Sequence, residues 1–350
     1  MASPQNNSVL LLYTGGTAGM VRNHDGVLVP FDFEQIESLL PELQRLPFQL
    51  AHWATEKPID SSNLKTPLWN ELAEVIEREY EKHIGFVILH GTDTMAFSAT
   101  ALSFLLKNLH KPVVFTGAQL PIGDIRTDAK ENILTALEIA GAEAMGLPVV
   151  PEVCIYFDYS LFRGNRSIKQ SSDRFEAFSS PNFPKLAEAG THIRFHQDFF
   201  HRSVGPFFIQ KSTFSNRVAT LRLFPGMGEN HVLPLTTSPH WDVVILRTYG
   251  SGNAPSEPEI MNALRQATNS GKVIVNITQC MSGRVVQDTY EVGRQLSEIG
   301  VVEGLDLTLE AALVKSMFIL GRGPFDPGSF KKEFQTILAG EMTASSEFHH

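Results

Sequence analysis

The feature that most constrains this chain is a repeated alternation between apolar runs of strand length and longer amphipathic segments. Strands buried on both faces of a parallel sheet carry nearly continuous apolar residues, and helices connect such strands. In the segments between the runs, apolar residues recur every three or four positions, as on one face of a helix. The alternation therefore predicts an α/β fold, with strands at 8–13, 48–53, 85–91, 112–117 and 152–159 and helices at 67–81, 94–107 and 127–144.

The alternation occurs twice, which predicts two domains. At 350 residues the chain also exceeds the length at which one hydrophobic core usually stops growing. We expect a larger N-terminal domain with a doubly wound, mostly parallel sheet over residues 8–190. A linker with edge strands over 191–216 and a smaller, flavodoxin-like α/β domain over 217–340 follow. In that second domain the expected strands are 218–226, 241–252 and 272–280, and the expected helices lie near 259–269, 290–299 and 308–320.

Composition and charge argue against several classes of protein. No uninterrupted apolar run approaches the ~20 residues that a membrane-spanning helix needs. The net charge of −9, with no basic cluster, argues against a general nucleic-acid binder. No secretory signal precedes the first strand, so we expect a cytoplasmic protein. Cys154 and Cys280 lie in separate strand-like runs and predict reduced, buried thiols rather than a disulfide or a metal site.

Polar clusters follow several of the predicted strands. In an open parallel sheet the ligand crevice lies beyond the carboxyl ends of the strands, so we expect these clusters to line one edge. The first cluster, with Gly15, Gly16 and Gly19, fits neither the G-x-G-x-x-G nor the P-loop spacing. We therefore expect the hydroxyls of Thr14 and Thr17 to matter more than the backbone amides of this turn. The clusters are TGGT at 14–17, HGTDT at 90–94, TGAQ at 116–119 and YGSGN at 249–253.

Two hydroxyl-bearing turns on one edge favour a nucleophilic site, although each turn alone is explained by capping of the helix that follows. A threonine needs a neighbouring base to become reactive. His90 is adjacent to the second turn, but a residue that closes a buried strand commonly points into the core. Lys169, held by Asp93, is the other candidate, although a lysine in a polar segment is commonly just solvated. The residue pattern leaves this choice open.

The chain resembles the cytosolic type I L-asparaginases of the bacterial-type asparaginase/glutaminase family. The resemblance runs from about residue 8 to residue 320, with the motifs in the same order. It implies hydrolysis of L-asparagine to L-aspartate and ammonia without a metal or an organic cofactor. The segments that carry it are YTGGTAGM, DSSN, ILHGTDTMAFSATALSFLL, TGAQLP, LFRGNRSIKQ, YGSGNAP and VNITQCMSG.

This resemblance also implies roles for individual residues. Thr14 matches the nucleophile, which attacks the side-chain amide carbon, forms an acyl-enzyme and releases ammonia. Thr92, Asp93 and Lys169 match the second triad of the family, which manages proton transfer.

Substrate-binding roles follow from the same resemblance. Ser61 and Ser62 match the residues that hold the α-carboxylate, although the segment DSSN is equally typical of an ordinary turn. Asp93 matches the group that receives the α-ammonium. The backbone amides of Thr92 and Ala118 match an oxyanion hole.

Two positions depart from the family pattern. Val27 stands where many members carry a tyrosine in a mobile lid. Tyr290 instead matches the tyrosine that a neighbouring subunit supplies in cytosolic members. Packing is the other explanation for a tyrosine on an amphipathic helix. Arg247 and Cys280 match residues near a regulatory asparagine site, but Ile168 replaces the threonine found in members with that site. Because family sites are completed across subunits, we expect a homodimer or a homotetramer.

Two other functions compete with this interpretation. The glutaminase subunit of a tRNA-dependent amidotransferase shares the fold, but it carries an additional N-terminal domain and its tRNA partner fits poorly with an acidic chain. A non-catalytic amino-acid sensor would have a damaged triad. The presence of Thr14, Thr92, Asp93 and Lys169 favours the enzyme.

Overall fold

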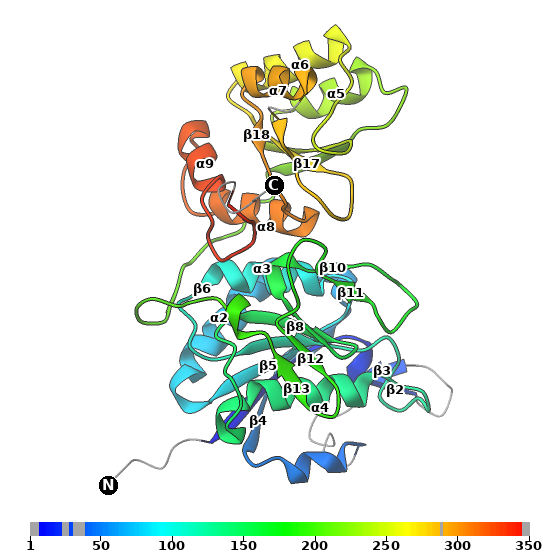
Figure 1. Ribbon diagram of the computed structural model, residues 1–350, viewed down its shortest axis with the longest axis vertical. Coiled ribbons are helices and arrows are strands. Elements are labelled where there is room, and N and C mark those ends of the chain that lie inside the picture. The colour runs from blue at the N-terminus through cyan, green and yellow to red at the C-terminus, as the bar shows by residue number, and fades with distance from the viewer. Residues whose placement is uncertain (1–6, 23–27, 31–38, 288–289, 345–350) are drawn as a thin grey trace. The chain divides into compact units, whose positions relative to one another are not determined.

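The structure is a computed structural model that describes residues 7–22, 28–30, 39–287 and 290–344. The chain divides into two compact units, Met1–Gln210 and Lys211–His350 (Figure 1). The segment 191–216, which the sequence predicts to be a linker, contains two short strands of the first unit. These are β13 (Ile193–Phe195) and β14 (Phe208–Ile209).

The first unit is built on an eight-stranded sheet with the order β13-β12-β9-β8-β7-β5-β1-β4. Strands β4, β1, β5, β7 and β8 are parallel, and β9, β12 and β13 extend the sheet in antiparallel fashion. The strands of this sheet are β1 Ser8–Gly15, β4 Gln49–Ile59, β5 Gly85–Leu89, β7 Val113–Thr116, β8 Val153–Phe157, β9 Ser160–Arg163, β12 Ala187–Ala189 and β13. Short two-stranded ladders join β2 Met20–Arg22 to β3 Leu28–Pro30, β6 Leu106–Lys107 to β14, and β10 Ile168–Lys169 to β11 Phe178–Ser179.

Helices cover both faces of this sheet, so the central strands are buried on both sides. Helices α2 (Pro67–Glu79) and α3 (Met95–Leu105) lie on one face, and α4 (Ala129–Ala140) lies on the other (Figure 1). Every residue of β5, β7 and β8 is buried. This burial explains why their sequences are continuously apolar, and it confirms the predicted doubly wound, mostly parallel sheet.

The order of the strands creates a switch point between β1 and β5. The chain leaves β1 for β4 on one side and then returns to β5 on the other side of β1. Connections that diverge in this way open a crevice at the carboxyl ends of the two strands, where open α/β sheets bind their ligands. The topology therefore favours a ligand site at the turns after β1 and β5.

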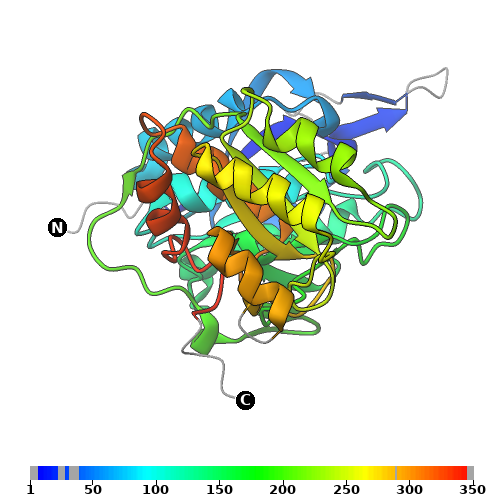
Figure 2. The same cartoon turned by 90° about the horizontal axis from the view of Figure 1, so that it is seen from above.

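The second unit has a four-stranded sheet in which all neighbours are parallel, in the order β15-β16-β17-β18. Helices α5, α6 and α7 lie side by side over one face (Figure 2). Its strands are β15 Val218–Arg222, β16 Val243–Thr248, β17 Val273–Thr278 and β18 Val302–Glu303, and its helices are α5 Glu229–Thr236, α6 Pro258–Asn269, α7 Glu291–Ile299, α8 Leu309–Leu320 and α9 Pro327–Phe334.

One prediction for the second unit is wrong: Cys280 is exposed, whereas Cys154 is buried as expected. Strand β17 ends at Thr278, so Cys280 already lies in the turn beyond the sheet. Among the described residues, no helix is long and apolar enough to cross a membrane.

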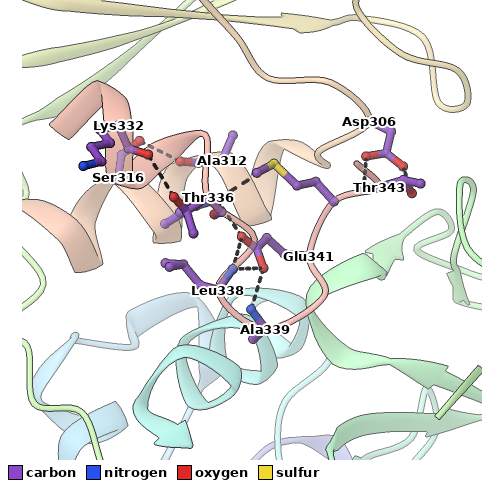
Figure 3. A network of polar contacts seen from close by, with 11 residues as sticks. Asp306, Ala312, Ser316, Lys332, Thr336, Leu338, Ala339, Glu341 and Thr343 are labelled. Carbon is purple, nitrogen blue, oxygen red and sulfur yellow. Dashed lines mark hydrogen bonds and ion pairs between the residues drawn. The ribbon is translucent and has the colours of Figure 1, made fainter. Parts of the chain in front are cut away.

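A buried ion pair fixes the C-terminal segment of the second unit to α8. The Nζ atom of Lys315 lies 2.6 Å from Oε1 of Glu341, and both side chains are fully buried. Lys315 also donates to the carbonyl of Thr336. The Glu341 carboxylate accepts the backbone N–H groups of Leu338 and Ala339 (Figure 3). The charge pair and its hydrogen bonds make this segment part of the folded unit.

Candidate active site

Thr14 lies near the end of β1, at the switch point of the sheet. Its side chain is buried, and its hydroxyl donates to the carbonyl of Leu89, the last residue of β5, at 2.9 Å. Gly16 follows with a φ of 87°, and a Cβ built on it would lie 2.5 Å from Cα of Gly91. Only glycine therefore allows the turn after β1 to close against the turn after β5.

The turn after β4 packs against the same place. Ser61 is buried, and a Cβ built on Gly91 would lie 2.5 Å from the Ser61 hydroxyl oxygen. The hydroxyl of Thr94 donates to the Ser61 carbonyl at 2.9 Å. Ser62 is exposed, and its backbone N–H donates to the carboxylate of Asp60, which caps this short turn. The two predicted carboxylate-binding serines therefore lie beside the turn after β5.

Lys169 connects the two other members of the predicted triad. Its Nζ donates to the Thr92 hydroxyl oxygen at 2.7 Å and to Oδ1 of Asp93 at 2.7 Å. The side chain of Lys169 is 19% exposed, whereas that of Asp93 is 62% exposed. The amine is thus largely withdrawn from water and contacts a hydroxyl on one side and a carboxylate on the other. This arrangement can move a proton to or from the threonine.

The turn after β7 completes the cluster. Ala118 is buried there, and a Cβ built on Gly117 would lie 2.5 Å from the carbonyl oxygen of His90. The turns that follow β1, β4, β5 and β7 are therefore in contact with one another. They gather Thr14, Ser61, Ser62, Thr92, Asp93 and Ala118 at one edge of the first unit's sheet, and Lys169 reaches this edge from β10.

His90, the alternative base, points into the core instead. It is 2% exposed, and burial lowers its pKa to about 4, although a hydrogen bond to the Gly91 carbonyl opposes the shift. Its two ring nitrogens contact the Gly91 carbonyl at 2.7 Å and the Ser98 hydroxyl at 2.9 Å. The imidazole is therefore neutral near pH 7, and both nitrogens already have partners.

The remaining candidates belong to other segments of the chain. Tyr290 belongs to the second unit, where it precedes α7 and is 53% exposed. Val27 lies outside the described residues. Ile168 pairs with Ser179 in the ladder of β10 and β11. Among the described residues, no group of three or more histidine, cysteine or acidic side chains is arranged to hold a metal ion.

Comparisons with known proteins match both units. The family model "Asparaginase, N-terminal" matches residues 8–200, and "Glutaminase/Asparaginase C-terminal domain" matches residues 217–334. This chain belongs to the asparaginase family. L-asparaginase 1 of Escherichia coli K12 is 38% identical over 97% of this chain and 99% of its own length. The crystal structure of L-asparaginase I from Vibrio cholerae aligns with a TM-score of 0.86 at 36% identity, covering 96% of this chain and 99% of that one.

Other relatives of this chain are longer proteins. The mouse protein named 60 kDa lysophospholipase is 40% identical over 96% of this chain, and this chain spans 62% of its length. One component of the glutamyl-tRNA(Gln) amidotransferase of Pyrococcus furiosus is a more distant relative at 32% identity over 96% of this chain and 77% of its own length. The amidotransferase alternative is thus less well matched than the asparaginase assignment.

Proposed function

We propose that this asparaginase-family protein hydrolyses L-asparagine to L-aspartate and ammonia through an acyl-enzyme on Thr14. The observation that carries the proposal is the contact of Lys169 with both Thr92 and Asp93, at the switch point where Thr14 also lies. A hydroxyl nucleophile requires such a proton-transfer partner. The identity of 38% to a protein named L-asparaginase 1 favours asparagine as the substrate.

The chemistry divides into two steps. The Thr14 oxygen attacks the side-chain amide carbon, and the carbon–nitrogen bond then breaks to release ammonia. Thr92 and Lys169 accept the proton that Thr14 loses and return one to the leaving nitrogen. Water then attacks the ester, releases aspartate and restores the Thr14 hydroxyl. The Thr92 and Ala118 amides would stabilise the oxyanion that forms in each step.

Recognition of the amino-acid end of the substrate would fall to polar groups at this edge of the sheet. Asp93 carries a negative charge that suits an α-ammonium, and the Ser61 and Ser62 hydroxyls suit an α-carboxylate. We further propose a cytoplasmic homodimer or homotetramer in which Tyr290 completes the site of a neighbouring subunit. Light scattering measures the assembly state, and a monomer that is fully active would contradict this second proposal.

The direct test is ammonia release from L-asparagine by the wild-type protein and by Thr14→Ala. We expect turnover by the wild type and a loss of at least about 10³-fold in the variant, because the nucleophile is gone. Circular dichroism should show an unchanged fold, since the loss of one buried hydroxyl and its bond to the Leu89 carbonyl costs only about 1 to 3 kcal/mol. A wild-type protein that binds asparagine without releasing ammonia would be a sensor instead. Full activity in Thr14→Ala would contradict the assignment of the nucleophile.

A further inference from the structure

Two peptide groups of the site have their carbonyl oxygens held by buried side chains. The Gly91 carbonyl accepts from His90, and the Gly117 carbonyl accepts from Nδ2 of Asn132 at 3.0 Å. The described residues contain no cis peptide bond, and in a trans peptide the C=O and the following N–H point in opposite directions. The N–H groups that follow belong to Thr92 and Ala118. Holding the two carbonyls therefore fixes the directions of the two proposed oxyanion donors.

The first carbonyl is anchored through a chain of three buried side chains. An indole N–H can only donate, so Trp69 donates to the Ser98 oxygen at 2.9 Å. A carbonyl oxygen can only accept, so Nδ1 of His90 carries the hydrogen that reaches the Gly91 carbonyl at 2.7 Å. In the neutral imidazole Nε2 then has a lone pair, and the Ser98 hydroxyl donates to it at 2.9 Å. The three side chains are at most 3% exposed. The chain ties the Gly91–Thr92 peptide to α2 and α3.

The second carbonyl is anchored through α4. Asn132 is fully buried, and its Oδ1 accepts the backbone N–H of Asp158 at 3.0 Å, which fixes the orientation of the amide. Its Nδ2 also lies 3.2 Å from Oδ2 of Asp128. The Asp128 carboxylate accepts the N–H groups of Gln119 and Leu120, the two residues after Ala118. The whole turn after β7 is thus held from the side of the helix.

The two held peptides are also fixed relative to each other. The His90 N–H donates to the Thr116 carbonyl at 3.0 Å, and Gly117 packs directly on the His90 carbonyl. The Thr92 and Ala118 amides therefore belong to one rigid assembly. Donors that need no reorganisation as charge develops are the ones that lower a reaction barrier most.

We propose that His90 and Asn132 are positioning residues that aim the Thr92 and Ala118 amides at the developing oxyanion. The inference rests on the proposed function, because it needs a reaction in which an oxyanion forms. Neither side chain touches the substrate; each acts through the peptide group whose carbonyl it holds. The structure thus assigns a role in the reaction to two buried residues, one on a strand exit and one on a helix.

The test compares His90→Leu and Asn132→Leu with the wild type in steady-state asparagine hydrolysis. Each change removes the donor to one carbonyl. We expect kcat to fall by about 10- to 100-fold, because a donor displaced by a fraction of an ångström stabilises the transition state poorly. The KM for asparagine and the Kd for L-aspartate should stay within about threefold, since the groups proposed to bind the ground state are untouched.

Two further variants separate positioning from general loss of packing. In His90→Asn, the Nδ2 atom is as many bonds from the backbone as Nδ1 of histidine, so it can donate to the Gly91 carbonyl and should recover a large part of kcat. Thr100→Val removes a buried hydrogen bond within α3, where the Thr100 hydroxyl donates to the Ala96 carbonyl at 2.7 Å. This control should lose stability while it keeps its kcat.

The possible outcomes are distinct. A wild-type protein that releases no ammonia contradicts the proposed function itself. An active wild type whose two leucine variants keep kcat within about twofold overturns the positioning role and leaves the function standing. If the leucine variants, His90→Asn and Thr100→Val all lost kcat equally, the loss would come from reduced stability and not from displaced amides. That result would also overturn the inference.

Discussion

Lys169 is the residue on which the proposed chemistry depends most directly. Replacing it by methionine keeps most of the side-chain volume but removes the group that contacts Thr92 and Asp93. We expect kcat to fall by about 10²- to 10⁴-fold, the usual contribution of a general acid–base group. Ammonia release is the measurement, and Lys185→Met is the control, because Lys185 forms only an exposed pair with Glu188 at 3.4 Å. Equal activities of the two variants would contradict the role of Lys169.

His90 also links stability to pH. Burial lowers its pKa to about 4 in the folded protein, whereas the pKa of a histidine in an unfolded chain is 6.5. The unfolded state therefore binds more protons between these values. The stability that comes from the neutral imidazole is complete above about pH 6.5 and is lost as the pH falls toward 4, by roughly 3 kcal/mol.

The measurement for this effect is urea unfolding of the wild type and of His90→Leu at pH 7.5 and at pH 4.5. The wild type should lose more free energy of unfolding between the two conditions than the variant does. His83, whose pKa burial also lowers, remains in both proteins and cancels in the comparison. Identical losses in the two proteins would show that His90 does not carry this dependence.

At the scale of elements, the close approach of the turns after β1 and β5 makes a sharp prediction for Gly16. In Gly16→Ala the new Cβ meets the backbone of Gly91 at 2.5 Å, so the two turns must separate. Gly226 offers a matched control, because its φ is also 87° but no atom lies within 4 Å of a Cβ built there. Both variants carry a strained backbone, which costs about 1 to 3 kcal/mol.

Only Gly16→Ala should also lose most of its asparagine turnover, because only there does the new Cβ force the turns after β1 and β5 apart. Unfolding curves and kcat of the two alanine variants, measured side by side, separate the shared strain from the displacement of the site. If Gly16→Ala kept its kcat, the turns would not need to touch for the reaction.

The sequence predicts elements well where local pattern and environment agree. The strands β1, β5, β7 and β8 are continuously apolar because both faces are covered, and the exits of β1, β5 and β7 carry polar residues of the site. The antiparallel strands β12 and β13 have three residues each and are largely only half-buried, so they leave little periodic signal. Helix α5 contains Pro234, which masks its helical pattern.

The contacts of His90 and Asn132 that orient the two amides could not be predicted from local sequence pattern, for a different reason. His90 reaches Ser98 and Trp69 through hydrogen bonds that depend on the packing of two helices on one sheet. Asn132 left a weak signal, because it is a polar residue among the buried positions Ala129, Ile133 and Ala136 of α4. A buried asparagine requires partners, but the sequence does not say which ones.

At the scale of the whole molecule, the described residues of each unit include an apolar core, and the second unit depends on charge as well as on apolar packing. Lys315→Met would leave Glu341 buried without its counter-ion, which typically costs about 3 to 5 kcal/mol. Denaturant unfolding measures the loss, and the double variant Lys315→Met with Glu341→Gln should lose less than the sum of its parts. Glu333→Gln, which disturbs a partly exposed pair with Arg322, should change stability by less than about 1 kcal/mol.

Asparagine hydrolysis by this chain would be divided between two kinds of residue. Those proposed to recognise the amino-acid end include Asp93 and Ser62, which are exposed, whereas His90 and Asn132 are sealed in the interior. Substitutions of the exposed groups can therefore change the preference for substrate, while the buried residues keep the oxyanion donors in place. Evolution would have had the same freedom, so substrate preference can drift without the reaction having to be rebuilt.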